Sequence, residues 1–199
     1  TVVVLMALLL IMGLITLFSA TYYQKSATGD ALAAVKKQLI GVALGAAACV
    51  VLSRVPYRFF RRPKVTLLLL AISALLLILV IIPGIGVSIN GSRRWLNIGG
   101  LSMQPSEFAK YAMVIFMAGA LDRRSEALGS LFAGVAPLLL IPGVMFLLIL
   151  EQPNLSTGGS ILICALVMLF AAGLKKRHMA LLGVSGFCLG AFYAWSAPY

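Results

Sequence analysis

Two ionisable side chains of opposite charge, Glu107 and Lys110, lie three residues apart in a stretch that is otherwise largely apolar. This spacing places both on one face of a helix, and ionisable groups inside a membrane span are functional by default. Arg93 and Arg94 precede them in a glycine-containing segment. Because guanidinium and ammonium groups donate charged hydrogen bonds to phosphate oxygens, we predict a polar cavity where Lys110 and Arg94 contact a phosphate and Glu107 orients them.

A simpler interpretation of the Glu107 and Lys110 pair remains open. The two side chains could form an ion pair within one helix, which would help a marginal span to insert, with Lys110 extending toward the head groups. Arg93 is kept as a second substrate-binding candidate of the same loop, which Asn90-Gly91 and Gly99-Gly100 shape into a hairpin-like excursion.

A second polar segment reads LEQPNLST and supplies two further substrate-binding candidates, Glu151 and Asn154. Pro153 ends one helix here, and we expect Ser156 or Thr157 to cap the next. Asn154 suits a local Asx-turn, which is the simpler role for it. Glu151 gains nothing from the helix dipole at a helix C-terminus, so a site role is the more informative hypothesis for it.

The composition places the chain in a lipid bilayer. It has 199 residues, of which 62% are hydrophobic and 11% charged, with a mean hydropathy of +1.08. The net charge of +11 does not indicate nucleic acid, because the basic residues lie in short loops between apolar blocks. Three cysteines, each inside an apolar block, predict neither a disulfide framework nor a metal site.

The apolar blocks predict an all-α, polytopic helical bundle with about seven transmembrane helices. We treat residues 1–199 as one transmembrane domain, truncated at both ends. The predicted spans are 1–20, 38–53, 65–85, 105–121, 127–150, 156–174 and 179–199.

Lysine and arginine counts predict the orientation. One side of the membrane receives ten of them: Arg54, Arg58, Arg61, Arg62, Lys64, Arg123, Arg124, Lys175, Lys176 and Arg177. The other side receives five: Lys25, Lys36, Lys37, Arg93 and Arg94. The positive-inside rule therefore puts the N-terminus in the cytoplasm and the 86–104 loop outside, with membrane lipids contacting the basic loops.

The segments NGSRRWLNIGGLSMQPSEFAK and EQPNLSTG resemble the SEDS (shape, elongation, division and sporulation) family, and the first is closer to its division and sporulation branch. The resemblance implies a bacterial cytoplasmic-membrane protein of about ten spans that polymerises lipid II into peptidoglycan. It implies as partners a class B penicillin-binding protein and other division proteins.

The resemblance also implies roles for individual residues. Arg94, Glu107 and Lys110 match family positions near the outward cavity. The family's general base is an aspartate expected beyond Tyr199, so no catalytic residue is assigned within this chain. Asn154 replaces the usual aspartate, and an amide cannot act as a base. No cofactor is assigned, and a divalent cation is left open.

Two other functions compete with the enzyme. A lipid II flippase would use polar residues at several depths, whereas charge here is confined to one predicted span. A non-catalytic membrane scaffold for a penicillin-binding protein is the other alternative.

Overall fold

A computed structural model describes residues 2–25, 31–89, 91–99, 101–123 and 129–196, which fall into two compact units. The first unit, Thr1–Pro56, contains helices α1 (Val2–Lys25) and α2 (Ala31–Ser53), which pack against each other. Most of their described side chains are apolar and exposed, as expected for helices that face lipid.

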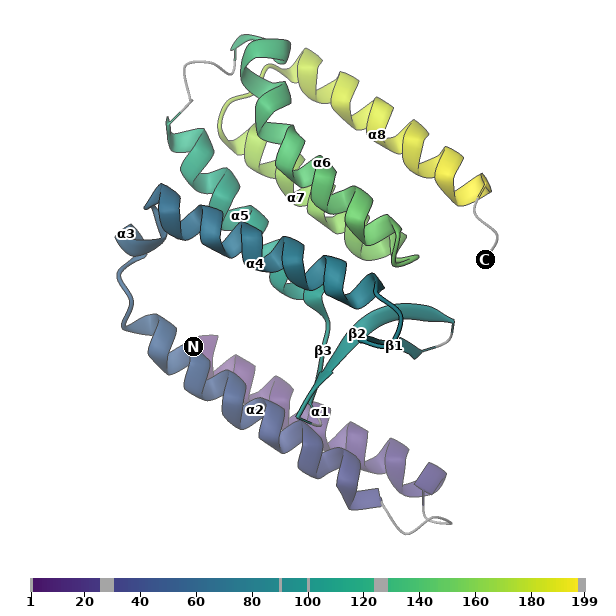
Figure 1. Ribbon diagram of the computed structural model, residues 1–199. Coiled ribbons are helices and arrows are strands. Elements are labelled where there is room, and N and C mark those ends of the chain that lie inside the picture. The colour runs from purple at the N-terminus through teal and green to yellow at the C-terminus, as the bar shows by residue number, and fades with distance from the viewer. Residues whose placement is uncertain (1, 26–30, 90, 100, 124–128, 197–199) are drawn as a thin grey trace. The chain divides into compact units, whose positions relative to one another are not determined.

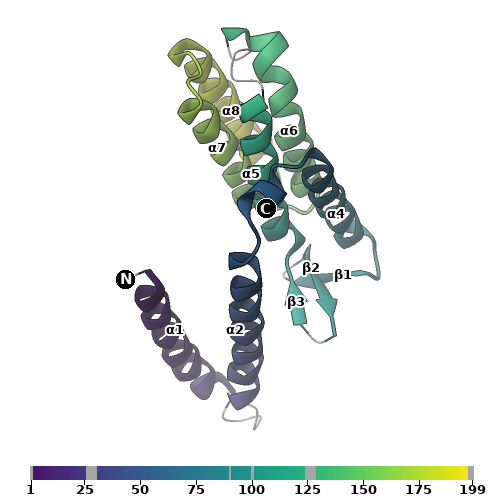
Figure 2. The ribbon, with the colours of Figure 1, turned by 90° about the vertical axis from the view of Figure 1, so that its left-hand side faces the viewer.

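The second unit, Tyr57–Tyr199, is a helical bundle with a small sheet at one end (Figures 1 and 2). Its helices are α3 (Tyr57–Phe60), α4 (Pro63–Ile81), α5 (Pro105–Arg123), the π-helical segment η2 (Leu131–Val135), α6 (Ala136–Leu150), α7 (Leu155–Ala171) and α8 (Lys176–Ser196).

Helix α5 contacts α4, α6 and α7, and the core of the second unit forms around these helices. Its buried face includes the alanines Ala109 and Ala112, whose small side chains let neighbouring helices approach closely. Large apolar side chains fill the space between the helices: Leu77, Met113, Met117, Leu138, Ile149, Ile161 and Leu169. This packing holds the first turns of α5 and α7 in a fixed relation.

The predicted helical class is confirmed, and each of the seven predicted spans overlaps one long helix. Four helical stretches are long and apolar enough to cross a membrane: Val2–Tyr22, Ala34–Ser53, Pro63–Ile81 and Leu131–Leu150. For the other three helices, a membrane crossing stays a prediction. The third span was predicted to reach residue 85, but α4 ends at Ile81 because Pro83 and Gly84 break the helix.

The loop after α4 forms a three-stranded antiparallel sheet, β1 (Gly86–Ile89), β2 (Ser92–Ile98) and β3 (Leu101–Met103), in that order. The hairpin-like excursion is thus confirmed, and the third strand is an addition to it. Gly91 and Gly99 have positive φ angles of 77° and 59°, a conformation that favours glycine. At Gly86 an added Cβ would lie 2.0 Å from the Val80 carbonyl oxygen, so only glycine lets β1 start against α4.

Candidate functional site

The first two turns of α5 carry the predicted charge pair. Lys110 Nζ lies 2.9 Å from Glu107 Oε1, and the two side chains are 29% and 49% exposed. Pro105 begins this helix, and its fixed φ angle and missing N–H suit that position. The structure therefore places both ionisable groups together, within reach of a ligand.

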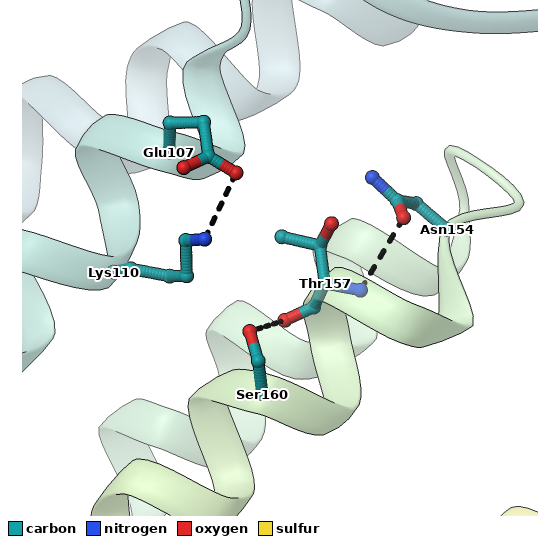
Figure 3. A network of polar contacts seen from close by, with 5 residues as sticks. All are labelled: Glu107, Lys110, Asn154, Thr157 and Ser160. Carbon is teal, nitrogen blue, oxygen red and sulfur yellow. Dashed lines mark hydrogen bonds and ion pairs between the residues drawn. The ribbon is translucent and has the colours of Figure 1, made fainter. Parts of the chain in front are cut away.

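The first turn of α7 lies across from this pair (Figure 3). Asn154 is only 6% exposed, and its Oδ1 accepts a hydrogen bond from the Thr157 backbone N–H at 3.3 Å. Asn154 is thus the N-cap of α7, which confirms its predicted local role. The expectation that Ser156 or Thr157 caps this helix is wrong, because α7 already begins at Leu155.

Two helix N-termini and one ammonium group therefore lie at the same end of the bundle. Thr157 faces the Glu107 and Lys110 pair, and Ser160 lies one turn further along α7, where its hydroxyl donates to the Thr157 carbonyl at 2.7 Å (Figure 3). Helix N-termini carry partial positive charge and unpaired N–H groups. The arrangement can bind an anion, and the ion pair with Glu107 restricts the positions that the Lys110 ammonium group can take.

Arg94 connects the sheet to the turn between α6 and α7. Its Nε donates to the Gln152 carbonyl at 3.1 Å, and its Nη2 donates to the Pro153 carbonyl and to Ser92 Oγ. These bonds join residues 58 and 59 positions apart, so Arg94 fixes the position of β2 on the bundle. Its role as a phosphate contact stays a prediction.

Arg93 and Glu151 lie differently from the other candidates. Arg93 is exposed and pairs with Ser88 of β1, whereas Val87 pairs with Trp95, so the ladder is irregular at Arg94 and strand alternation does not relate the two arginines. Glu151 is exposed at the C-terminal end of α6. The structure forms no ion pair to either residue within the part of the chain that it describes.

Gln152 is a residue that the sequence analysis missed. Its side chain is 1% exposed, and its Nε2 donates a hydrogen bond to the Leu77 carbonyl of α4 at 3.2 Å. Its backbone carbonyl accepts the hydrogen bond from Arg94 Nε. Its Oε1 is buried and has no hydrogen-bond partner among the described residues. A glutamine at the end of an apolar span, directly before proline, is the sequence signal that could have identified it.

No group of three or more His, Cys, Asp or Glu side chains that could hold a metal ion lies within the described residues. The fold and the site define a polytopic helical membrane protein with a polar cluster at one end of its bundle.

Comparison with known proteins gives the family. The chain matches the FTSW_RODA_SPOVE family, described as "Cell cycle protein", over residues 1–199 and belongs to it. This confirms the predicted SEDS membership.

The relatives include a sporulation protein and proteins named as probable peptidoglycan glycosyltransferases. The chain is 37% identical over 198 residues to "Stage V sporulation protein E" of Bacillus subtilis, covering 99% of this chain and 54% of that protein. It is 38% identical over 167 residues to "Probable peptidoglycan glycosyltransferase FtsW" of Saccharophagus degradans, covering 83% and 42%. The chain thus spans about half the length of the curated relatives it matches.

Two solved structures are similar as well. The Thermus thermophilus rod shape determining protein RodA has a TM-score of 0.60 at 28% identity, over 89% of this chain and 58% of that one. A chain from "Structural coordination of polymerization and crosslinking by a peptidoglycan synthase complex" has a TM-score of 0.63 at 28% identity, over 94% and 56%.

Proposed function

We propose that the protein carrying this chain is a peptidoglycan glycosyltransferase that polymerises lipid II during cell division or sporulation. The observation that carries the proposal is the Glu107 and Lys110 pair on α5, facing the N-terminus of α7, in a family whose relatives bear that enzyme name. A lipid-linked pyrophosphate is the leaving group of such a reaction, and a fixed cation stabilises the charge that develops on it.

In this proposal each residue of the site has a distinct task. Lys110 contacts the pyrophosphate, and Glu107 orients the ammonium group through the 2.9 Å ion pair. Arg94 holds β2 against the turn after α6, and its remaining guanidinium N–H groups face the substrate. Arg93 and Glu151 are secondary binding candidates at the exposed rim, and Asn154 sets the start of α7.

The chemistry also requires a base. As the acceptor sugar hydroxyl attacks the anomeric carbon, its proton is taken up by a carboxylate while the pyrophosphate leaves. We assign that carboxylate to the region of the family that follows the part matched here.

We place the sheet and the charge pair at the outer face of the cytoplasmic membrane, with the N-terminus in the cytoplasm. The excess of lysine and arginine on the opposite side supports this orientation. A class B penicillin-binding protein and other division proteins are the proposed partners, as the synthase complex among the similar structures suggests.

A lipid II flippase is less well supported. In α4, α6 and α7, no described residue beyond the first helical turn is charged, so a polar path through the bilayer has no charged steps there. A non-catalytic scaffold for a penicillin-binding protein predicts that the α5 charges are dispensable for glycan synthesis.

The test is lipid II polymerisation by the purified full-length protein with its penicillin-binding partner. Lys110→Ala and Glu107→Gln should each lower glycan strand formation by at least tenfold, because both disturb the cation at the leaving group. Lys176→Ala removes an exposed lysine at the start of α8 and is the matched control, which should retain activity.

Each variant is also checked for a single monodisperse peak on size exclusion, which shows that it is folded. Full glycan synthesis by both folded α5 variants would refute the proposed site. The Glu107 and Lys110 ion pair would then have only a structural role. Loss of activity in Lys176→Ala as well would show that the assay does not isolate this site.

A further inference from the structure

The second unit contains a cavity at the end of α5 that lies away from the sheet. Its volume is about 380 Å³, and it lies between α3, the turn that precedes α4 and the last turns of α5. The residues that line it are Tyr57, Phe60, Arg61, Ile115, Ala118, Gly119 and Asp122. Its walls are thus mainly apolar, and its polar groups are a tyrosine and one ion pair.

The polar part of this cavity is held by several contacts. Arg61 Nη2 lies 2.6 Å from Asp122 Oδ2, and Arg123 Nη1 donates to the Arg61 carbonyl at 3.5 Å. The Thr66 hydroxyl donates to the Phe60 carbonyl at 3.0 Å, which fixes the turn between α3 and α4. Arg61 therefore lies at the cavity with one edge of its guanidinium engaged by Asp122.

The charge around the cavity is strongly positive. Five cations lie on the segments that form it, against Asp122 as their single carboxylate: Arg58, Arg61, Arg62, Lys64 and Arg123. Because Asp122 balances only one of them, the surface attracts an anion. Basic pockets between helices at the cytoplasmic side of a membrane suit the head groups of anionic lipids.

We propose that this cavity binds an anionic phospholipid. One acyl chain lies against Phe60, Ile115 and Ala118, and the phosphodiester accepts hydrogen bonds from the Nε and Nη1 groups of Arg61. The Tyr57 hydroxyl, at the exposed mouth, donates to the same head group. A soluble anion would use only the cations and leave the apolar walls empty, whereas a phospholipid matches both parts of the cavity.

The bound lipid would bridge two segments that Arg61 already connects, through its ion pair with Asp122 and the hydrogen bond that its carbonyl accepts from Arg123. It contacts α3 and the turn before α4 on one side and the end of α5 on the other, so it stabilises the second unit at the end away from the charge pair. The site is therefore independent of the proposed enzyme activity, which uses the opposite end of α5.

The experiment measures lipid retention by the purified full-length protein. The protein is equilibrated in mixed micelles with phosphatidylglycerol or with phosphatidylcholine, and retained lipid is counted by native mass spectrometry. We expect at least a tenfold preference for phosphatidylglycerol. Equal retention of the two lipids would overturn the proposal, because it would show an apolar groove without head-group recognition.

Two variants test the two parts of the cavity separately. Arg61→Gln combined with Asp122→Asn removes the head-group contact without leaving an unpaired charge, and Ala118→Phe fills the chain-binding part from an exposed position. Either should lower phosphatidylglycerol retention at least tenfold. Arg58→Gln removes a cation from the same segment but outside the lining, and retention should fall less than threefold.

Folding is checked by size exclusion and by the melting temperature in lipid-free detergent. Unchanged lipid retention in a folded Ala118→Phe variant would overturn the proposal. So would a variant that keeps its lipid but loses a co-purifying protein, because the cavity would then be the docking site of a partner helix.

Discussion

Arg94 of β2 donates hydrogen bonds to the turn between α6 and α7, and we predict that its substitution loosens this turn whereas substitution of the neighbouring Arg93 does not. Arg94→Lys keeps the positive charge but removes the planar fork that reaches both the Gln152 and Pro153 carbonyls. A hydrogen bond from a charged donor contributes about 1.5–3 kcal/mol to stability, and bonds that water can reach lie at the low end of this range. A lysine at position 94 can keep one of the two bonds to the turn. The expected cost is therefore about 1–2 kcal/mol, or roughly a 5- to 30-fold shift toward local opening.

Hydrogen–deuterium exchange of the full-length protein in detergent measures this opening directly. The backbone amides of Glu151, Gln152 and Gly158 are hydrogen-bonded within the turn and the start of α7, and should exchange about 5- to 30-fold faster in Arg94→Lys. Arg93→Lys is the matched control, because Arg93 is the adjacent exposed residue, and exchange in the turn should not change.

Unchanged exchange in Arg94→Lys would refute the reasoning, since it would mean that the turn holds its position without the Arg94 fork. Equal acceleration in both variants would refute it as well, because strand propensity rather than the Arg94 bonds would then be the cause. Only a difference between Arg94→Lys and Arg93→Lys supports a specific bond.

Two further substitutions test the start of α7. Asn154→Ala removes the cap on the Thr157 N–H and should cost about 1 kcal/mol of stability, whereas Asn154→Asp should keep the cap. Thermal unfolding measures the stability of both variants, and equal losses would contradict the capping role. Gly158→Ala should destabilise by about 1–3 kcal/mol, because an added Cβ would lie 2.9 Å from the Phe146 ring. Gly159→Ala, which meets nothing within 4 Å, should be neutral or stabilising, and a loss equal to that of Gly158→Ala would argue against packing as the cause.

Much of the helical fold could be predicted because it depends on local patterns. An uninterrupted apolar block must satisfy its backbone hydrogen bonds within a helix in lipid, so block limits approximate helix limits. The predicted limit is wrong at the end of α4, where the apolar residues continue to Ile85 but Pro83 and Gly84 end the helix at Ile81. The hairpin followed from turn residues, which act locally in the same way.

The long-range contacts of the site could not be predicted in this way. Glu107 and Lys110 are three residues apart, and helical geometry alone brings them together. Arg94 and Gln152 are 58 residues apart, and nothing in the spacing of either segment indicates that the guanidinium faces a carbonyl rather than a ligand. Gln152 was missed for the same reason, because its partner on α4 is 75 residues away.

The side-chain amide of Asn154 has a local role, as the N-cap of α7, and also affects the charge of the neighbouring cluster. Capping α7 requires only a side-chain oxygen that accepts the Thr157 N–H, and asparagine and aspartate serve equally as N-caps. What the amide changes is charge, because an aspartate would add a second carboxylate at the helix end that faces Glu107 and Lys110 (Figure 3). With asparagine, Glu107 is the carboxylate paired with Lys110, so the cluster keeps more of its positive potential for the anion that we propose it binds. Asparagine at this position therefore keeps the start of α7 and, in the proposed site, suits anion binding rather than proton transfer.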